Sequence, residues 1–304
     1  MSLFFASLNS GSNGNCYYVG NENEAVLIDA GISCKETEKR MVTLGLSLKK
    51  VKGIFVSHEH GDHIKGVSTL ANKYQIPVYI STLTAKNGPR LITHLSKSFS
   101  NHQQIMLDGL AITPFSKQHD AIDPYSFIIE YNTICVGVFT DIGVCCANVK
   151  NYFAKCHALF LESNYDEVML ENGRYPLHLK NRIRNGQGHL SNKQALELFV
   201  EHKNENLSHL ILAHLSKENN TPDLVKELFQ TNSMIKKILI GLLIALVVIQ
   251  FIRPERNLSG DTKNDISTKY PMPDSVKAIV TKACADCHSN KTAYPWYASI
   301  QPLS

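Results

Sequence analysis

The stretch VSHEHGDHIKG, residues 56–66, gathers metal-binding side chains within six positions, at His58, His60, Asp62 and His63. It follows a run typical of a buried strand. In an extended turn His58 and His60 point the same way, while Asp62 and His63 begin the next helix and point to a neighbouring position. Imidazole and carboxylate ligands in two adjacent sets suit two divalent ions better than a closed structural zinc site, which favours thiolates. The pattern predicts a two-metal centre.

Four more His and Asp residues stand at the ends of predicted strands. They are Asp29 in LIDAG, His119 in SKQHD, Asp141 in FTDIG and His214 in LILAHLS. A single residue of this kind is usually a core or surface residue rather than a ligand. In the company of H-x-H-x-D-H, and in this order along the chain, we expect the four to belong to the same site.

The chain order of an Asp, H-x-H-x-D-H, a His, an Asp and a His resembles the five motifs of the metallo-β-lactamase superfamily. The resemblance implies an α/β fold, the αββα sandwich, with two divalent ions of Zn, Mn or Fe. It also implies that Asp29 orients the His-rich loop and is not itself a ligand. By position, one ion would be held by His58, His60 and His119, and the other by Asp62, His63 and His214, with Asp141 bridging both.

Three features bear on the branch of that superfamily. Zinc β-lactamases resemble one another in having a Cys where this chain has Asp141, so hydrolysis of β-lactams is disfavoured. GHLSNKQALELF puts His189 at a helix start, where backbone N–H groups and the helix dipole hold phosphate. LFLESNY puts Glu162 at a strand end. The two resemble the ribonuclease Z-like pair in which a His, oriented by a Glu, protonates the leaving oxygen; the alternative is a helix cap with a solvated His.

Five segments together closely resemble the small YycJ/WalJ-type hydrolases, over roughly residues 2–230. That resemblance implies a single-domain nuclease with 5′–3′ DNA exonuclease activity, DNA being favoured over RNA, and Asp62, Glu162 and His189 as catalytic residues. The segments are SLNSGSNGNCYYV, SHEHGDH, LESNYD, GHLSN and AHLSKENNTP.

A basic run, RYPLHLKNRIRNGQGH, leads to His189. Such a run is usually a solvated helix face. Because it precedes a phosphate-type turn, Lys180, Arg182 and Arg184 are also candidates for contact with a nucleic-acid backbone. Both interpretations stay open at this point.

Short β-branched runs, which are typical of strands, alternate with helical stretches along the first 230 residues. This pattern indicates sheets covered by helices. After TPDLVKELFQ the similar hydrolases continue with a final strand, whereas here an apolar segment begins. We therefore expect the last strand to be missing, which leaves a sheet edge unpaired. Strands are predicted over 25–31, 53–58, 78–81, 125–132, 134–141, 158–164 and 208–215.

Length and composition predict more than one unit. A chain of 304 residues allows about two domains, and 43% hydrophobic residues exclude a disordered chain. Residues 234–304 carry 9 Lys and Arg against 5 Asp and Glu, so the excess of +4 lies there. Bulk charge therefore gives no support for strong nucleic-acid binding, which only a local patch could supply. We predict a hydrolase domain over 1–233, a membrane helix over 234–256 and a haem-binding segment over 257–304.

The predicted membrane helix is centred on an apolar run from Ile238 to Ile252, preceded by Lys236 and Lys237. These residues span about 22 Å as a helix, short of the roughly 30 Å hydrocarbon core unless the lysines snorkel. Membrane contact is expected through residues 235–252, with a buried core helix as the alternative. Singly scattered cysteines and the lack of a signal sequence favour a cytoplasmic hydrolase domain, with the haem segment outside the cytoplasm.

The sequence CADCH has the spacing of covalent haem attachment. Cys284 and Cys287 would form the thioethers, and His288 would be the proximal iron ligand of a haem c. With the following SNKTAYPWY it resembles small haem-binding domains of bacterial envelope proteins, mainly α and truncated here. The apolar stretch before it therefore looks like a seam between two unrelated units.

Two rival functions remain. The first is an envelope haem-binding or electron-transfer protein in which the hydrolase is vestigial. The second keeps the enzyme and changes the substrate to a thioester or small ester, as in glyoxalase-like relatives. The residues do not indicate an oligomeric state.

Overall fold

The computed structural model describes residues 3–251, 256, 259–263 and 265–284. The chain divides into two compact units, Met1–Phe229 and Gln230–Ser304. Every strand of the described residues, and every predicted ligand of the two-metal centre, belongs to the first unit. The boundaries expected after residues 233 and 256 stay predictions.

The first half of this unit forms a six-stranded sheet, called sheet A here. Its first three strands are antiparallel and the last three run parallel to the third. The parallel connections pass through helices α1 (Cys34–Thr43), α2 (Gly61–Ile64), α3 (Val67–Tyr74) and α4 (Thr82–Asn87). The strands stand in chain order: β1 (Phe4–Asn9), β2 (Cys16–Gly20), β3 (Ala25–Ile28), β4 (Val51–Phe55), β5 (Val78–Ile80) and β6 (Ser96–Ser98).

The second half repeats this plan as sheet B, which also has six strands in chain order. Four antiparallel strands are followed by two parallel ones. The parallel connections pass through α5 (Ala147–Phe153), then α6 (Glu167–Asn172), α7 (Leu177–Arg184) and α8 (Asn192–His202). The strands are β7 (Ile105–Leu107), β8 (Leu110–Ser116), β9 (Tyr125–Tyr131), β10 (Ile134–Phe139), β11 (Ala158–Glu162) and β12 (His209–Ala213).

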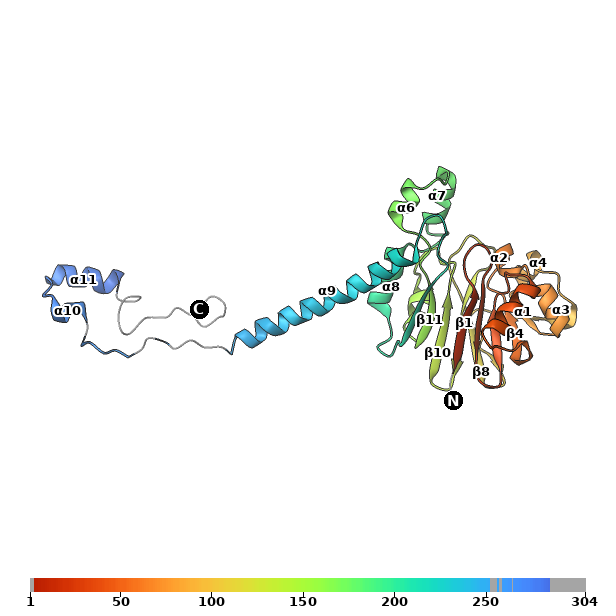
Figure 1. Cartoon of the computed structure of the whole chain (residues 1–304), viewed down its shortest axis with the longest axis horizontal. Coiled ribbons are helices and arrows are strands. Elements are labelled where there is room, and N and C mark those ends of the chain that lie inside the picture. The colour runs from red at the N-terminus through yellow and green to blue at the C-terminus, as the bar shows by residue number, and fades with distance from the viewer. Residues whose placement is uncertain (1–2, 252–255, 257–258, 264, 285–304) are drawn as a thin grey trace. The chain divides into compact units, whose positions relative to one another are not determined.

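Alternation along the strands builds the layers of the core. In β3, Leu27 packs in the cluster of α1 and α3, whereas Val26 faces the space between the sheets. In β11, Phe160 faces that same space, and Leu161 joins the cluster of α5 and α8. Successive side chains of a strand point to opposite faces, so each sheet is covered on both sides. Figure 1 shows helices outside both sheets, and the predicted αββα sandwich is confirmed.

One edge of sheet B is β12, which pairs only with β11 among the described strands. Its side chains are buried less than those of β11, and Ile211 is 37% exposed. In the described part of the chain beyond β12 the elements are helices. Among the described residues no strand pairs with the outer side of β12, and the missing final strand stays a prediction.

In chain order, helix α9 (Pro222–Ile249) stands where that strand was expected, and it contains most of the apolar run. Among the described residues, no helix is long and apolar enough to cross a membrane. The predicted membrane helix over 234–256 is therefore not supported. The physical reason lies in the length of the run, since the apolar residues from Ile238 onward span only about 22 Å of helix against a roughly 30 Å hydrocarbon core.

Beyond α9, the described residues form two helices, α10 (Ile266–Lys269) and α11 (Asp274–Ala283). Cys284 ends α11 with an exposed side chain. The other residues of the expected haem attachment, Cys287 and His288, lie outside the described residues.

Candidate metal centre

The predicted ligands follow strands that end at the same edge of the two sheets. His58 and His60 lie between β4 and α2, and Asp62 and His63 lie in α2. The remaining donors, His119, Asp141 and His214, follow β8, β10 and β12. Ligands in α/β proteins usually bind beyond the carboxyl ends of strands. The fold thus brings together residues from widely separated parts of the sequence, His119, Asp141 and His214 among them.

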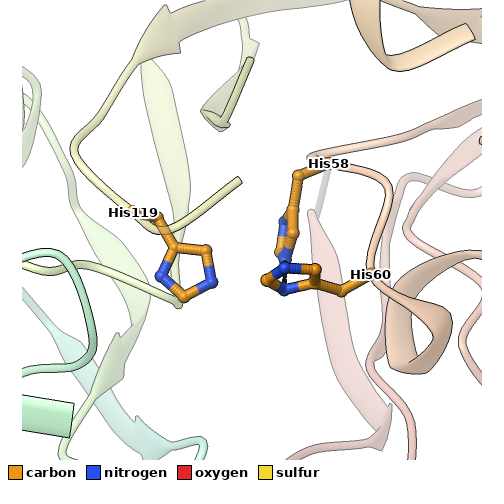
Figure 2. A group of neighbouring side chains, drawn as sticks. All are labelled: His58, His60 and His119. Atoms are coloured by element: carbon orange, nitrogen blue, oxygen red, sulfur yellow. Dashed lines mark hydrogen bonds between the residues drawn. The ribbon is translucent and has the colours of Figure 1, made fainter. Parts of the chain in front are cut away.

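Three imidazoles form the first group of donors. One nitrogen each of His58, His60 and His119 lies within 4.8 Å of the others. Figure 2 shows the three rings converging, with a hydrogen bond of 3.1 Å between His58 Nε2 and His60 Nδ1. His119 is turned by a hydrogen bond from its Nδ1 to the Gly188 carbonyl, 2.9 Å away, which leaves Nε2 facing the group. Three nitrogen donors at this spacing fit one borderline divalent ion.

A second group of donors comprises Asp62, His63 and His214, again within 4.8 Å. Asp141 lies between the two groups. Its Oδ2 is 3.3 Å from His63 Nε2, and its Oδ1 is 3.5 Å from His214 Nε2 and 3.9 Å from His119 Nε2. The carboxylate faces donors of both groups, which is the position that a bridging ligand needs.

Three of the residues around the centre adopt left-handed backbone conformations. The φ angles are 60° for Asp29, 55° for Asp141 and 56° for His214. For residues other than glycine this region is sparsely populated and costs about 1–3 kcal/mol each. The conformation turns the chain sharply as each strand ends, so that the side chain points into the site. Strain of this kind persists where the surrounding structure enforces it.

Buried donors without hydrogen-bond partners test whether the site fits a metal. Among the described residues, the buried atoms that lack such a partner include His119 Nε2, Asp141 Oδ2 and His214 Nε2. Leaving a buried polar atom unpaired is unfavourable. His119 Nε2 and His214 Nε2 lie 3.9 Å and 3.5 Å from the other oxygen of Asp141, and divalent cations coordinated by N and O donors would satisfy the unpaired atoms. The residues present therefore fit two metal ions.

The electrostatic field of the site attracts cations. Burial acts to lower the pKa of His63, but the Asp141 and Asp29 carboxylates outweigh it and raise the pKa to about 10. Burial also acts to raise the pKa of Asp141, yet His214 and His63 hold it well below its usual range. Burial lowers the pKa of His119 to about 4. Asp141 thus stays ionised and His119 stays neutral, which are the forms that bind metals, whereas His63 must release its proton when a metal binds.

Asp29, expected to orient the His-rich loop, is fully buried beside it. Its Oδ1 accepts from the Ser57 backbone N–H at 2.7 Å, and its Oδ2 lies 2.8 Å from Ser57 Oγ and 2.7 Å from His63 Nδ1. The contact with Nδ1 leaves His63 Nε2 directed at Asp141. A carboxylate on the distal nitrogen is a common way to orient a histidine ligand.

Glu162 joins the two histidines of sheet B. Its Oε1 lies 2.8 Å from His189 Nδ1 and 2.8 Å from His214 Nδ1, while Oε2 accepts from the backbone N–H groups of Ile142 and Leu190. Burial acts to raise the pKa of Glu162, but His189 and His214 bring it down to about 2. The structure thus places a buried, ionised carboxylate behind both rings. His189 is half-buried and lines a cleft with the donors.

The backbone N–H groups at the start of α8, which were expected to hold a phosphate, already have acceptors within the protein. The N–H of Leu190 donates to Glu162, that of Ser191 to the Gln194 side chain, and that of Asn192 to the Tyr165 carbonyl. A capping box satisfies the first turn of the helix. These donors are therefore used within the protein, and the contribution of this segment is the His189 side chain.

Sequence analysis missed Asn15, which is fully buried behind the second group. Its Nδ2 lies 3.0 Å from His63 Nε2 and 3.3 Å from Asp62 Oδ2, and its backbone N–H donates to the Asp62 carbonyl at 2.7 Å. The only signal is its place in the loop SGSNGN. There Gly14 has a φ of 136°, a conformation that side chains rarely adopt.

Lys117 was missed as well. It is 6% exposed, and its Nζ donates to the Thr140 carbonyl at 2.6 Å. Burial lowers its pKa, with Asp141 acting in the opposite direction. The ammonium group thus fixes the strained turn before Asp141 from a position two residues before His119.

The three cations predicted to contact a nucleic-acid backbone, Lys180, Arg182 and Arg184, differ in their surroundings. Lys180 and Arg184 turn to Glu171, through its carbonyl and its carboxylate respectively. Arg182 pairs with Asp120 and lines the cleft of about 420 Å³ that contains His60, Asp62 and His189. Of the three cations, only Arg182 is among the residues that line the cleft.

The two units of the chain are similar to different families of known proteins. The metallo-β-lactamase superfamily model matches residues 10–130. Exodeoxyribonuclease YycJ of Bacillus anthracis is 36% identical over 230 residues, which cover 74% of this chain and 87% of the relative. This chain belongs to the YycJ/WalJ family of the metallo-β-lactamase superfamily. The family resemblance predicted from the motifs is thereby confirmed.

Another YycJ/WalJ family member is exodeoxyribonuclease WalJ of Streptococcus pneumoniae, strain D39. It is 30% identical over 227 residues, which cover 72% of this chain and 84% of WalJ. A solved structure of the metallo-β-lactamase fold protein YhfI from Bacillus subtilis aligns with a TM-score of 0.56 and 16% identity. It covers 76% of this chain and 93% of YhfI, and supports the fold.

The second unit matches a different family. The haem-binding domain model matches residues 244–304, so its match begins within α9 and includes CADCH. The match supports the haem-binding segment expected from the sequence. Attachment through Cys284, Cys287 and His288 stays a prediction.

Proposed function

We propose that this chain is a metal-dependent exodeoxyribonuclease that hydrolyses phosphodiester bonds. The observation that carries the proposal is the convergence of two donor groups on Asp141, with His189 and its Glu162 partner in the same cleft. The names of the YycJ and WalJ relatives support DNA as the substrate. The 5′–3′ direction rests on the sequence resemblance alone.

Two divalent ions, Zn, Mn or Fe, are proposed as cofactors. His58, His60 and His119 would hold one, Asp62, His63 and His214 the other, and Asp141 would contact both. When bound, two such ions supply Lewis acidity and lower the pKa of water at the reacting phosphate. The protein itself contributes the orientation of these ligands through Asp29, Glu162 and Asn15.

His189 is proposed as the general acid. Its Nδ1 contacts Glu162, so the proton for transfer is carried on Nε2. Burial acts to lower the pKa of His189, but Glu162 raises it above the usual value. This favours the protonated ring, the form that donates to a departing sugar oxygen. Asp62, which is also proposed as a catalytic residue, lines the cleft with His60.

A nuclease panel tests the proposal on the purified full chain. Single-stranded and duplex DNA and RNA are supplied with manganese, zinc or iron in turn, and products are separated by length. We expect stepwise shortening of DNA that a chelator stops and one of the metals restores. His94→Ala is a matched control, since His94 is exposed and outside the site. Loss of cleavage in His60→Ala, but not in His94→Ala, would support the assignment; thioester cleavage without nuclease activity would overturn it.

For the second unit we propose covalent haem binding through Cys284, Cys287 and His288, supported by the family match over residues 244–304. Coexpression of the full chain with a c-type maturation system should give a covalent haem absorption band that survives denaturation. Cys287→Ser should weaken this band. A chain that carries no haem under these conditions would contradict the proposal.

A further inference from the structure

Helix α7 and the turn that joins it to α6 form a wall of the cleft. None of the predicted ligands of the two-metal centre lies on this wall. Helices α6 and α7 stand together beyond the strand ends of sheet B (Figure 1). Tyr175, in the turn between them, and Leu179, on α7, are half-buried and line the cleft together with Arg182. The cleft therefore has an aromatic and aliphatic surface on the side that carries no metal donors.

This wall is built as a fixed structure. Its own small cluster contains Tyr165, Leu170 and Ile183, against which Tyr175 and Leu179 pack. The N–H of His189 donates to the Ile183 carbonyl at 2.9 Å. A Cβ on Gly188 would lie 2.2 Å from that carbonyl oxygen, so the chain approaches closely only because residue 188 is glycine.

Gly188 also connects the wall to the first donor group. Its carbonyl accepts from His119 Nδ1, and the next residue is the proposed general acid. The apolar wall is therefore held at a set position relative to both His119 and His189. A group bound on the wall would lie beside a phosphate at the metal centre.

Arg182 provides a cation at the same wall. Its side chain is 58% exposed and pairs with Asp120, whose Oδ1 is 3.3 Å from His119 Nε2. An exposed ion pair of this kind contributes little net stability. A phosphate oxygen can therefore replace Asp120 as the partner, and guanidinium groups bind phosphate well.

We propose that Tyr175, Leu179 and Arg182 form a subsite for the nucleotide next to the scissile bond. This proposal rests on the proposed nuclease function. The base stacks on Tyr175 and packs against Leu179, and the flanking phosphate pairs with Arg182. Aromatic side chains bind the faces of bases without reading their sequence. A base exposes its face to such a wall only when it is unstacked from its neighbour, so the subsite takes an unstacked nucleotide.

A double-mutant cycle with the metal-loaded full chain tests the stacking. The probe is a fluorescent single-stranded phosphorothioate oligonucleotide, which resists cleavage, with either a base or an abasic residue beside the bound linkage. Tyr175→Ala and the abasic change should each weaken binding about tenfold. The two changes combined should weaken binding no more than either change alone, because both remove the same contact. Tyr175→Phe should bind like the unaltered chain, and so should Leu177→Ala, which changes an exposed residue of α7 outside the cleft.

A salt titration tests the phosphate contact. Loss of one contact with a single strand lowers the slope of log Kd against log salt by about 0.7, the change expected for Arg182→Gln. Lys193→Gln is the matched control, because Lys193 is also an exposed, paired cation but lies outside the cleft. Additive losses in the cycle, or equal slopes for the two cation variants, would overturn the subsite. Because Kd is the readout, a chain that binds in this way but cleaves no DNA would contradict only the proposed function.

Discussion

Sheet A and sheet B supply the candidate metal centre in different ways. Sheet A provides His58, His60, Asp62 and His63 from the single segment after β4, which ends in α2. Sheet B provides one donor from each of several strand ends, and each is oriented by a partner distant in sequence, as Glu162 orients His214. The comparison teaches that one half of such a site is a local property of the chain, while the other half exists only once the sheet has formed.

The largest effect should come from removing one donor of each half. His60→Ala and His214→Ala should each lower DNA cleavage by about 10³-fold or more, because each takes a ligand from a different group. Metal content and cleavage rate are the measurements. If His214→Ala kept both, the role given to sheet B would be wrong.

The second effect separates acid catalysis from metal binding. His189→Ala should lower kcat by about 10²–10⁴-fold while metal content is retained. The pKa of His189 is raised by Glu162 against the effect of burial, and the protonated ring is the active form. Activity should therefore fall as pH rises through this pKa, and the variant should lose that alkaline limb. An unchanged pH profile in the variant would assign the proton transfer elsewhere.

A smaller effect is expected behind the His-rich loop. Asn15→Ala removes contacts to both His63 and Asp62, so metal affinity should fall by about 10–100-fold. Asn13→Ala is the control, since Asn13 is exposed in the same loop. Metal titration followed by calorimetry distinguishes the two. Equal affinities would mean that sheet A orients its loop without this residue.

The smallest effect concerns the open edge of sheet B. Ile211→Lys should change stability by less than about 0.5 kcal/mol, because this side chain is partly exposed on an edge strand. It should also reduce association at high concentration, since charged residues protect edges. Light scattering measures the association. Increased aggregation would show that the strand is covered in solution.

The donors of sheet A were also easier to predict from the sequence than the residues whose contacts form only in the folded chain. His58 to His63 were readable because their spacing alone brings the donors together. Alternating strands and helices predicted sheets covered by helices, while the αββα sandwich was predicted from the resemblance to the metallo-β-lactamase superfamily. Asn15 and Lys117 were missed because their importance depends on contacts with Asp62 and Thr140, far along the chain. The basic run shows what the sequence alone does not reveal. Lys180, Arg182 and Arg184 look alike in the sequence, but their side chains have different surroundings in the structure. The predicted membrane helix was not supported because hydropathy was weighted above length.

The left-handed backbone at Asp29, Asp141 and His214 limits how stable this fold can become. Glycine adopts that conformation freely, so replacing any of the three by glycine would relieve local strain while removing a side chain of the site. Selection for thermal stability and selection for metal binding therefore favour different residues at these positions. A laboratory search for heat-resistant variants should find its inactive solutions there first.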